Sequence, residues 1–325
     1  MRELTTTQIL RETLAAEMRR DGRVFLMGED IGVYGGSFGV TRGLIDEFGP
    51  ERVRDTPISE PAIAGAACGA AAGGSRPVAE IMFMDFMTLC VDQLVNQAAK
   101  LHYLHGIECP MVVRTPSGGG RGYGATHSQS FERLFFGAPG LRIAAPATGE
   151  DASGLLQTAI RDPNPVIFVE HKRLYPLRWE MPDDGLPPPT PFGKARIARA
   201  GTDVTIVAWS WMAHLAELAA DRLTEDEISA EVIDLRTLNP LDRDALAASA
   251  CKTCRVLVVE EAPLTGGISG EIAAIVGEAA FGRLAAPVRR LAAPDCPIPA
   301  ARPLEAAVLP SEEAIYQAAL ELATL

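Results

Sequence analysis

Short apolar runs alternate with helical patterns along almost the whole chain, and this alternation constrains the fold more than any other feature. The runs that predict buried strands are 24–30, 76–83, 110–116, 141–148, 165–171, 204–210, 230–235 and 255–261. Between them, apolar residues recur at helical spacing and predict helices at 5–20, 85–104, 150–162, 212–223, 242–250, 268–281 and 311–323. Strands that alternate with helices are typical of parallel, doubly wound sheets, so we expect an α/β protein.

A proline-rich stretch interrupts the alternation. This stretch, residues 174–193, shows neither the helical nor the strand period of apolar residues. Its sequence, LYPLRWEMPDDGLPPPTPFG, is typical of a linker between domains. The alternation resumes after them. The sequence therefore predicts two doubly wound domains, 1–175 and 192–325, joined by a linker at 176–191.

Composition and charge exclude several classes of function. The 325 residues carry a net charge of −12, and Lys and Arg are scattered, so nucleic acid and anionic membrane are poor candidate partners. We find no apolar run of the roughly 18 residues that a membrane span needs and no signal-peptide pattern, and we expect a cytoplasmic protein. The pair Cys251 and Cys254 has no second pair for zinc, and we interpret both as ordinary small residues.

One carboxylate stands at the start of a helix built from very small residues. In DTPISEPAIAGAACGAAAGG, Glu60 lies between Ser59 and Pro61. An acid near a helix N-terminus is stabilising by roughly 0.3–1 kcal/mol, so capping is the ordinary explanation. Small side chains also allow close packing, however, and a buried carboxyl group holds its proton more strongly. We therefore consider Glu60 a candidate for proton transfer or for a strong charged hydrogen bond.

A glycine-rich loop, SGGGRGYGA, follows the strand predicted at 110–116. Gly120, Gly122 and Ala125 match GxGxxA, but no clear helix follows, and we interpret the loop as flexible backbone near a site. His127 comes just after the loop. Because α/β sheets bind ligands beyond the carboxyl ends of their strands, His127 is a candidate functional residue.

Motifs along the whole chain resemble those of the β subunit of the thiamine-diphosphate-dependent E1 component of 2-oxo acid dehydrogenase complexes. They occur in the family's order and spacing: FLMGEDIGVYGG, FGVTRGLIDEFGPERVRDTPISE, RPVAEIMFMDF, DQLVNQAAK, THSQS, PGLRIAAPAT, AIRDPNPVIFVEHKRLYP, DLRTLNPLD and AAPDCPIPAA. The resemblance implies an N-terminal pyrimidine-binding domain and a C-terminal transketolase-like domain that contacts other subunits and E2.

The resemblance also implies roles for individual residues. Glu60 should hydrogen-bond the N1′ nitrogen of the aminopyrimidine of thiamine diphosphate, and Met82 and Phe86 should flank that ring. His127 should handle protons or orient groups during decarboxylation or transfer to the lipoyl group. A potassium ion is expected at Met111, Ala159, Ile160, Asp162 and Asn164.

A missing motif indicates a partner. The chain contains no GDG sequence, the start of the motif with which such enzymes hold Mg²⁺ and the diphosphate. The resemblance therefore implies that an E1 α subunit holds Mg²⁺ in an α2β2 heterotetramer, which passes the acyl unit to a lipoyl-bearing E2.

The substrate is less constrained. The pattern of Asp85, Phe86, Met87 and Cys90 is similar to acetoin-cleaving members, which favours acetoin slightly over pyruvate and then branched-chain 2-oxo acids. Two other classes compete with this interpretation. A transketolase-like enzyme would carry all its domains on a longer chain with its own GDG, and a scaffold subunit would have no need for Glu60 and His127.

Overall fold

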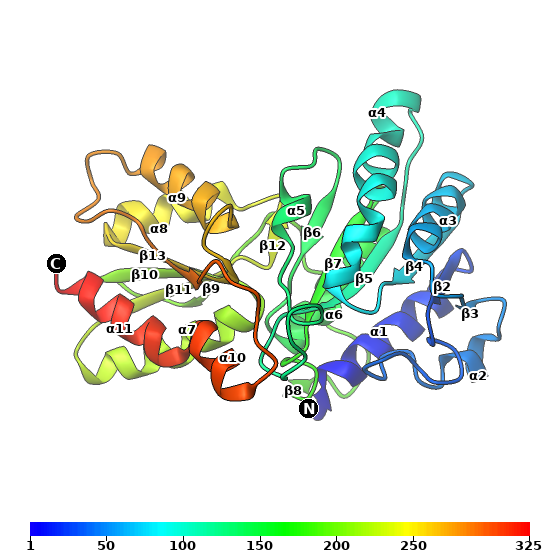
Figure 1. Cartoon of the computed structure of the whole chain (residues 1–325), viewed down its shortest axis with the longest axis horizontal. Helices are drawn as coiled ribbons and strands as arrows, with labels where there is room; N and C mark the ends of the chain where they lie inside the picture. Colours follow the sequence, from blue (N-terminus) through cyan, green and yellow to red (C-terminus); the bar gives the residue numbers. More distant parts are fainter. The chain divides into compact units, whose positions relative to one another are not determined.

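The computed structural model describes all 325 residues and divides the chain into two compact units (Figure 1). Unit 1 contains residues 1–117 and 134–192, and unit 2 contains residues 118–133 and 193–325. The contacts thus assign the segment 118–133, which includes the glycine loop and His127, to unit 2.

Unit 1 contains a sheet of parallel strands in the order β6-β7-β5-β4-β2-β3. The strands are β2 (Val24–Gly28), β3 (Val53–Asp55), β4 (Arg76–Glu80), β5 (Val112–Ser117), β6 (Arg142–Ala144) and β7 (Val166–His171). Every residue of β5 and β7 is buried, as expected for parallel strands covered on both faces. A separate antiparallel pair joins β1 (Arg2–Thr5) to β8 (Arg178–Met181), which lies within the expected linker.

The helices of unit 1 cover this sheet. They are α1 (Thr6–Arg20), α2 (Leu44–Phe48), α3 (Glu60–Ala72), α4 (Leu101–His105), α5 (Arg133–Phe136) and α6 (Gly149–Arg161). Helix α1 packs against α6, and their apolar side chains, Leu14 and Leu155 among them, form the core with Phe168 of β7. Thr5 starts α1 with a reciprocal capping box to Gln8, which explains why that helix begins where the pattern predicts.

The helix predicted at 85–104 is irregular. The segment consists of η1, a 3₁₀ helix at Met84–Cys90, η2, a π-helix at Asp92–Gln97, η3, a second 3₁₀ turn at Ala98–Lys100, and the short α4. Apolar spacing alone does not distinguish these helix types: η1, η2 and η3 bury some of the apolar residues, whereas α4 buries none. Changes of helix type of this kind often accompany functional sites.

Unit 2 contains a second doubly wound sheet in the order β14-β13-β10-β11-β9. Its strands are β9 (Arg196–Arg199), β10 (Val204–Ala208), β11 (Ala230–Asp234), β13 (Val256–Pro263) and β14 (Arg289–Ala293), and only β9 pairs antiparallel; a short strand, β12, spans Thr237–Asn239. Its helices are α7 (Ser210–Glu225), α8 (Arg243–Thr253), α9 (Ile268–Ala279), α10 (Arg302–Val308) and α11 (Glu312–Ala323). Helices α7 and α11 pack together on one face, and α8 and α9 pack on the other (Figure 1). The predicted α/β class is confirmed in both units.

None of these helices combines the length and the apolar character that crossing a membrane requires.

A buried ion cluster joins three neighbouring strands of unit 1, between the middle of β5 and the carboxyl ends of β4 and β7. The Arg114 guanidinium bonds Glu80 at 2.7 Å and forms two bonds of 2.7 Å with Glu170, whose carboxylate also accepts the Tyr175 hydroxyl at 2.6 Å. Burial raises the pKa of Glu80, and the Arg114 charge opposes that shift. The Arg114 guanidinium therefore supplies the positive charge that allows the Glu80 and Glu170 carboxylates to be buried in the sheet.

We expect Arg114→Leu to lower the free energy of unfolding by about 3–5 kcal/mol, because it leaves two buried carboxylates without their partner. Equilibrium unfolding in urea measures this loss. Arg54→Leu is the matched control: Arg54 forms an exposed pair with Glu51, and the expected loss is below about 1 kcal/mol. Equal losses in the two variants would contradict the assigned role of Arg114.

Candidate functional site

Glu60 is the first residue of α3, and its side chain is only 7% exposed. Pro61 occupies the first turn, where its missing N–H costs nothing, and the Ser59 side chain makes no capping bond. No protein group donates a hydrogen bond to the Glu60 carboxylate. A buried acceptor at the positive end of a helix is thus available to a ligand that carries a hydrogen-bond donor.

A second acid, Glu29, lies beside Glu60. It directly follows β2, and the Ser59 backbone N–H donates to its carboxylate. Burial raises the pKa of Glu29, and the negative charge of Glu60 raises it further. Sequence analysis missed Glu29, although an acid directly after a buried parallel strand is a signal that could have identified it.

The segment that follows β4 contacts α3 and carries the two apolar candidate residues. Met82 and Phe86 are half-buried, and the Phe86 ring meets the Phe83 ring edge to face at 5.8 Å between centroids. Four residues on, the Cys90 thiol donates to the backbone oxygen of Glu60 at 3.3 Å. Burial, with the charges of Glu60 and Glu29, raises the pKa of Cys90 to about 12, so this thiol stays protonated and acts as a donor. The helical turn that carries Phe86 is therefore fixed directly to the start of α3.

Exposed apolar side chains come from the same parts of unit 1. Ile58, two residues before Glu60, is 83% exposed, and Val33 and Tyr34 in the loop after β2 are 87% and 68% exposed. The outer face of α3 is also open: no atom lies within 4 Å of a Cβ built on Gly69. The small side chains of α3 thus leave one face of the helix ready for close contact with another molecule.

His127 lies in unit 2. Its ring is half-buried, and Nδ1 forms a hydrogen bond of 3.0 Å with the Thr126 hydroxyl. The backbone N–H of His127 donates to the Gly124 carbonyl at 3.3 Å. The chain on both sides of His127 is tied to unit 2: the Glu261 carboxylate accepts the Gly119 N–H at 2.6 Å and the Ser130 hydroxyl at 3.4 Å.

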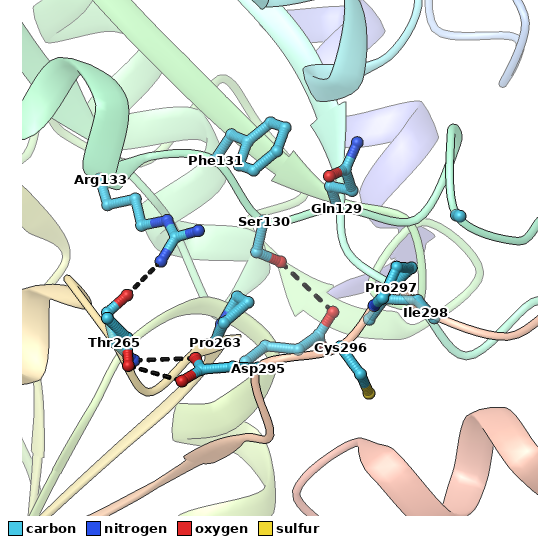
Figure 2. Close-up of a pocket in the computed structure, with 12 residues that line it drawn as sticks. Gln129, Ser130, Phe131, Arg133, Pro263, Thr265, Asp295, Cys296, Pro297 and Ile298 are labelled. Atoms are coloured by element: carbon cyan, nitrogen blue, oxygen red, sulfur yellow. Dashed lines mark hydrogen bonds between the residues drawn. The ribbon is translucent and has the colours of Figure 1, made fainter.

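A cavity of about 610 Å³ opens next to this segment within unit 2 (Figure 2). Phe131, Pro263 and Ile298 contribute apolar walls. The polar rim is fixed by hydrogen bonds, from Arg133 to the Thr265 carbonyl at 2.5 Å and from the Thr265 hydroxyl to Asp295 at 2.5 Å. The cavity is large enough for a small organic group.

The expected potassium residues lie around the end of α6 in unit 1. Ala159 and Ile160 belong to its last turns, Asp162 follows its end, and the Asp162 carboxylate accepts both the backbone and side-chain N–H groups of Asn164 at 2.8 Å. The Met111 carbonyl accepts the Val166 N–H at 2.9 Å. Backbone oxygens of this kind are the ligands that potassium prefers.

Arg76 supplies a positive charge at the same oxygens. Its guanidinium donates to the Ile160 carbonyl at 2.7 Å and to the Asp162 carbonyl at 3.3 Å. A cation here would have to share these two oxygens with Arg76, and Arg142 pairs with the Asp162 carboxylate at 3.0 Å.

Comparison with known proteins assigns both halves of the chain. Residues 2–178 match the transketolase pyrimidine-binding domain, and residues 193–315 match the transketolase C-terminal domain. The 2-oxoisovalerate dehydrogenase subunit beta of Bacillus subtilis is 47% identical over 94% of both chains. The pyruvate dehydrogenase E1 component subunit beta of Rickettsia felis is 44% identical over 97% of both. The acetoin:2,6-dichlorophenolindophenol oxidoreductase subunit beta of Cupriavidus necator is 44% identical over 98% of this chain and 97% of its own.

Solved structures agree at the level of the fold. A split-gene transketolase, described as an inactive beta4 tetramer, matches 99% of both chains with a TM-score of 0.78 at 22% identity. A transketolase from Pichia stipitis matches 100% of this chain and 46% of its own, with a TM-score of 0.71 at 14% identity.

Glu29 generates a pH-dependent prediction. Its pKa is higher in the folded than in the unfolded chain, so its stabilising contribution is complete below the unfolded value and is lost as the pH rises through the folded value. Glu29→Gln removes this loss of stability at high pH, because the amide does not ionise. We expect the variant to exceed the wild type in free energy of unfolding at about pH 8 and to match it at about pH 4, measured in urea. Exposed Glu51→Gln is the control, and a difference for Glu29→Gln that does not change with pH would contradict the assignment.

Proposed function

Because this chain belongs to the family of E1 β subunits of pyruvate, branched-chain and acetoin dehydrogenases, we propose that it supplies the pyrimidine half of a thiamine-diphosphate site in such an enzyme. The buried Glu60 carboxylate carries the proposal, since it faces no protein donor. A structural cap would not need burial beside a second acid, whereas a cofactor ring with a protonated nitrogen would complete the site.

The residues of the site take distinct roles in this proposal. When bound, thiamine diphosphate supplies a carbon nucleophile and an electron sink for cleavage next to a carbonyl group. Glu60 would bind the N1′ nitrogen and hold the proton at that atom, beside Glu29, whose pKa is raised by burial and by the Glu60 charge. Met82 and Phe86 pack on the ring and exclude water. His127 moves a proton or orients the acceptor during acyl transfer, and the cavity beside it admits that acceptor.

An α subunit completes the enzyme. The sequence has no GDG motif, so Mg²⁺ and the diphosphate belong to the partner in an α2β2 heterotetramer. Exposed Val33, Tyr34 and Ile58 and the open face of α3 give the partner apolar surface close in sequence to Glu60. Unit 2 is proposed to contact the other subunits and the lipoyl-bearing E2. The proposed location is the cytoplasm.

Three donors are candidate substrates: acetoin, pyruvate and branched-chain 2-oxo acids. Relatives named for each are 44–47% identical to this chain, so identity does not rank them. The slight preference for acetoin from Asp85, Phe86, Met87 and Cys90 gains no support from the comparisons. A side-by-side assay of acetoin, pyruvate and 3-methyl-2-oxobutanoate with the assembled enzyme and an artificial electron acceptor separates the three.

Glu60→Gln tests the proposal. We expect the variant to assemble with the α subunit and to lose about 100-fold or more in turnover, because the amide cannot hold the proton at the ring nitrogen. Glu150→Gln is the matched control, since Glu150 is an exposed acid in the first turn of α6. Full turnover of Glu60→Gln with the preferred substrate would show that Glu60 is only a helix-capping acid.

The proposed potassium site has its own test. We expect potassium chloride to raise the melting temperature above that in choline chloride at equal ionic strength, because the ion binds only the folded chain. Arg76→Met should make this difference larger, since the Ile160 and Asp162 carbonyls then lose a donor. Identical melting temperatures in the two salts for both proteins would exclude a potassium site here.

A further inference from the structure

The glycine loop is tied down by a carboxylate from the far end of the chain. Glu305 of α10 is 2% exposed, and its two oxygens accept the N–H groups of Gly120 and Gly122, each at 2.8 Å. One buried side chain thus grips two alternate residues of the loop. Hydrogen bonds from backbone N–H groups to an ionised acceptor are among the stronger ones in proteins.

The backbone of the loop is shaped for this grip. Gly118, Gly120, Gly122 and Gly124 all have φ between 75° and 87°, the region that side-chain-bearing residues rarely adopt. Turns of this kind direct alternate N–H groups into a concave site for an anion. Here the anion is the protein's own carboxylate.

Close packing explains why the loop is glycine. A Cβ on Gly119 would lie 2.8 Å from the Leu309 side chain, and one on Gly122 would lie 3.1 Å from the Ala300 carbonyl. These contacts press the loop onto residues 300–309, the segment that carries Glu305. The loop is therefore held in place. Its glycines allow both the positive-φ turns and the close contact with residues 300–309.

The grip extends to His127 along the chain. Gly122, which Glu305 holds, is two residues from Gly124, whose carbonyl accepts the His127 N–H. Glu261 holds both sides of the same stretch through Gly119 and Ser130. Two buried carboxylates thus fix the backbone from which His127 projects.

We propose that Glu305 is a positioning residue for His127, acting through its two hydrogen bonds to the glycine loop. The proposal rests on the role of His127 proposed above. Glu305 reaches no reacting group in this role, and its effect on the reaction is transmitted by the loop backbone. A structural alternative is that Glu305 only secures α10, with no consequence for His127.

Glu305→Gln tests the grip with little change in volume. A carboxamide can accept one of the two N–H groups, but its own NH₂ group meets the other, so one bond is lost. The first readout is hydrogen exchange by mass spectrometry in the α–β holoenzyme, in peptides covering 118–131. We expect the Gly120 and Gly122 amides to exchange about tenfold faster. Glu278→Gln, an exposed acid on α9, is the control and should leave exchange unchanged.

The second readout is a double-mutant cycle with His127→Ala. We measure reduction of an artificial acceptor and transfer to a lipoyl domain for Glu305→Gln, His127→Ala and the combined variant. We expect Glu305→Gln to lower kcat about tenfold in the same half-reaction as His127→Ala, with KM and thiamine diphosphate affinity unchanged. The combined variant should be no slower than His127→Ala alone, because the loop has nothing left to position.

The outcomes separate the two proposals. Unchanged hydrogen exchange of the loop amides in Glu305→Gln would show that Glu305 does not restrain the loop, whatever the activities of the variants. Faster exchange with losses that multiply in the combined variant overturns the positioning role in favour of the structural one. Full activity of His127→Ala would contradict the role of His127 in the proposed function. It would also overturn the proposed positioning of His127 by Glu305. The exchange data would then still show whether Glu305 restrains the loop.

Discussion

The pairing of Arg114 with Glu80 and Glu170 is the interaction on which the architecture of unit 1 depends. It joins β4, β5 and β7, and the segments that follow these strands contain candidate functional residues. β4 leads to Met82 and Phe86, and β5 leads to the glycine loop. A further buried cation, Lys172, follows β7 directly, and its Nζ lies 5.1 Å from the centre of the Phe83 ring. Unit 1 thus buries two cations, Arg114 and Lys172, in and directly after the strands of its sheet.

The site itself is built in the opposite manner. Glu60 and Glu29 are two acids close together with no buried cation paired to either, and the raised pKa of Glu29 records the strain of that arrangement. The Ser59 N–H donates to the Glu29 carboxylate, and the Cys90 thiol, whose pKa is also raised, donates to the backbone oxygen of Glu60. The absence of a paired cation at these two acids, in a unit that pairs Arg114 with Glu80 and Glu170, is consistent with the proposed cofactor site.

Much of this organisation could be predicted from the sequence, because it is encoded locally. Buried parallel strands have continuous apolar sequences, such as residues 165–171. Glu60 is conspicuous in the sequence because Pro61 and a run of Ala and Gly follow it. The edge strands β9 and β14 were missed, since RIAR and RRLAA are half-exposed and carry charge. Glu29 was missed because a single acid after a strand has no pattern until its neighbours are known.

The glycine loop shows the limit of local reasoning. Its sequence suggested flexible backbone, yet the loop is gripped by Glu261 and Glu305, which lie 142 residues from Gly119 and 185 residues from Gly120. No periodicity connects residues so far apart. The assignment of 118–133 to unit 2 follows from those same contacts and is equally invisible in the sequence.

The occupied anion site in the loop has a consequence for substrate recognition. Because the Glu305 carboxylate already takes the Gly120 and Gly122 N–H groups, those donors are closed to the carboxylate of an incoming 2-oxo acid. These two N–H groups therefore cannot distinguish a charged keto acid from neutral acetoin. Under the proposed function, discrimination between a charged and an uncharged substrate would then arise from residues other than Gly120 and Gly122.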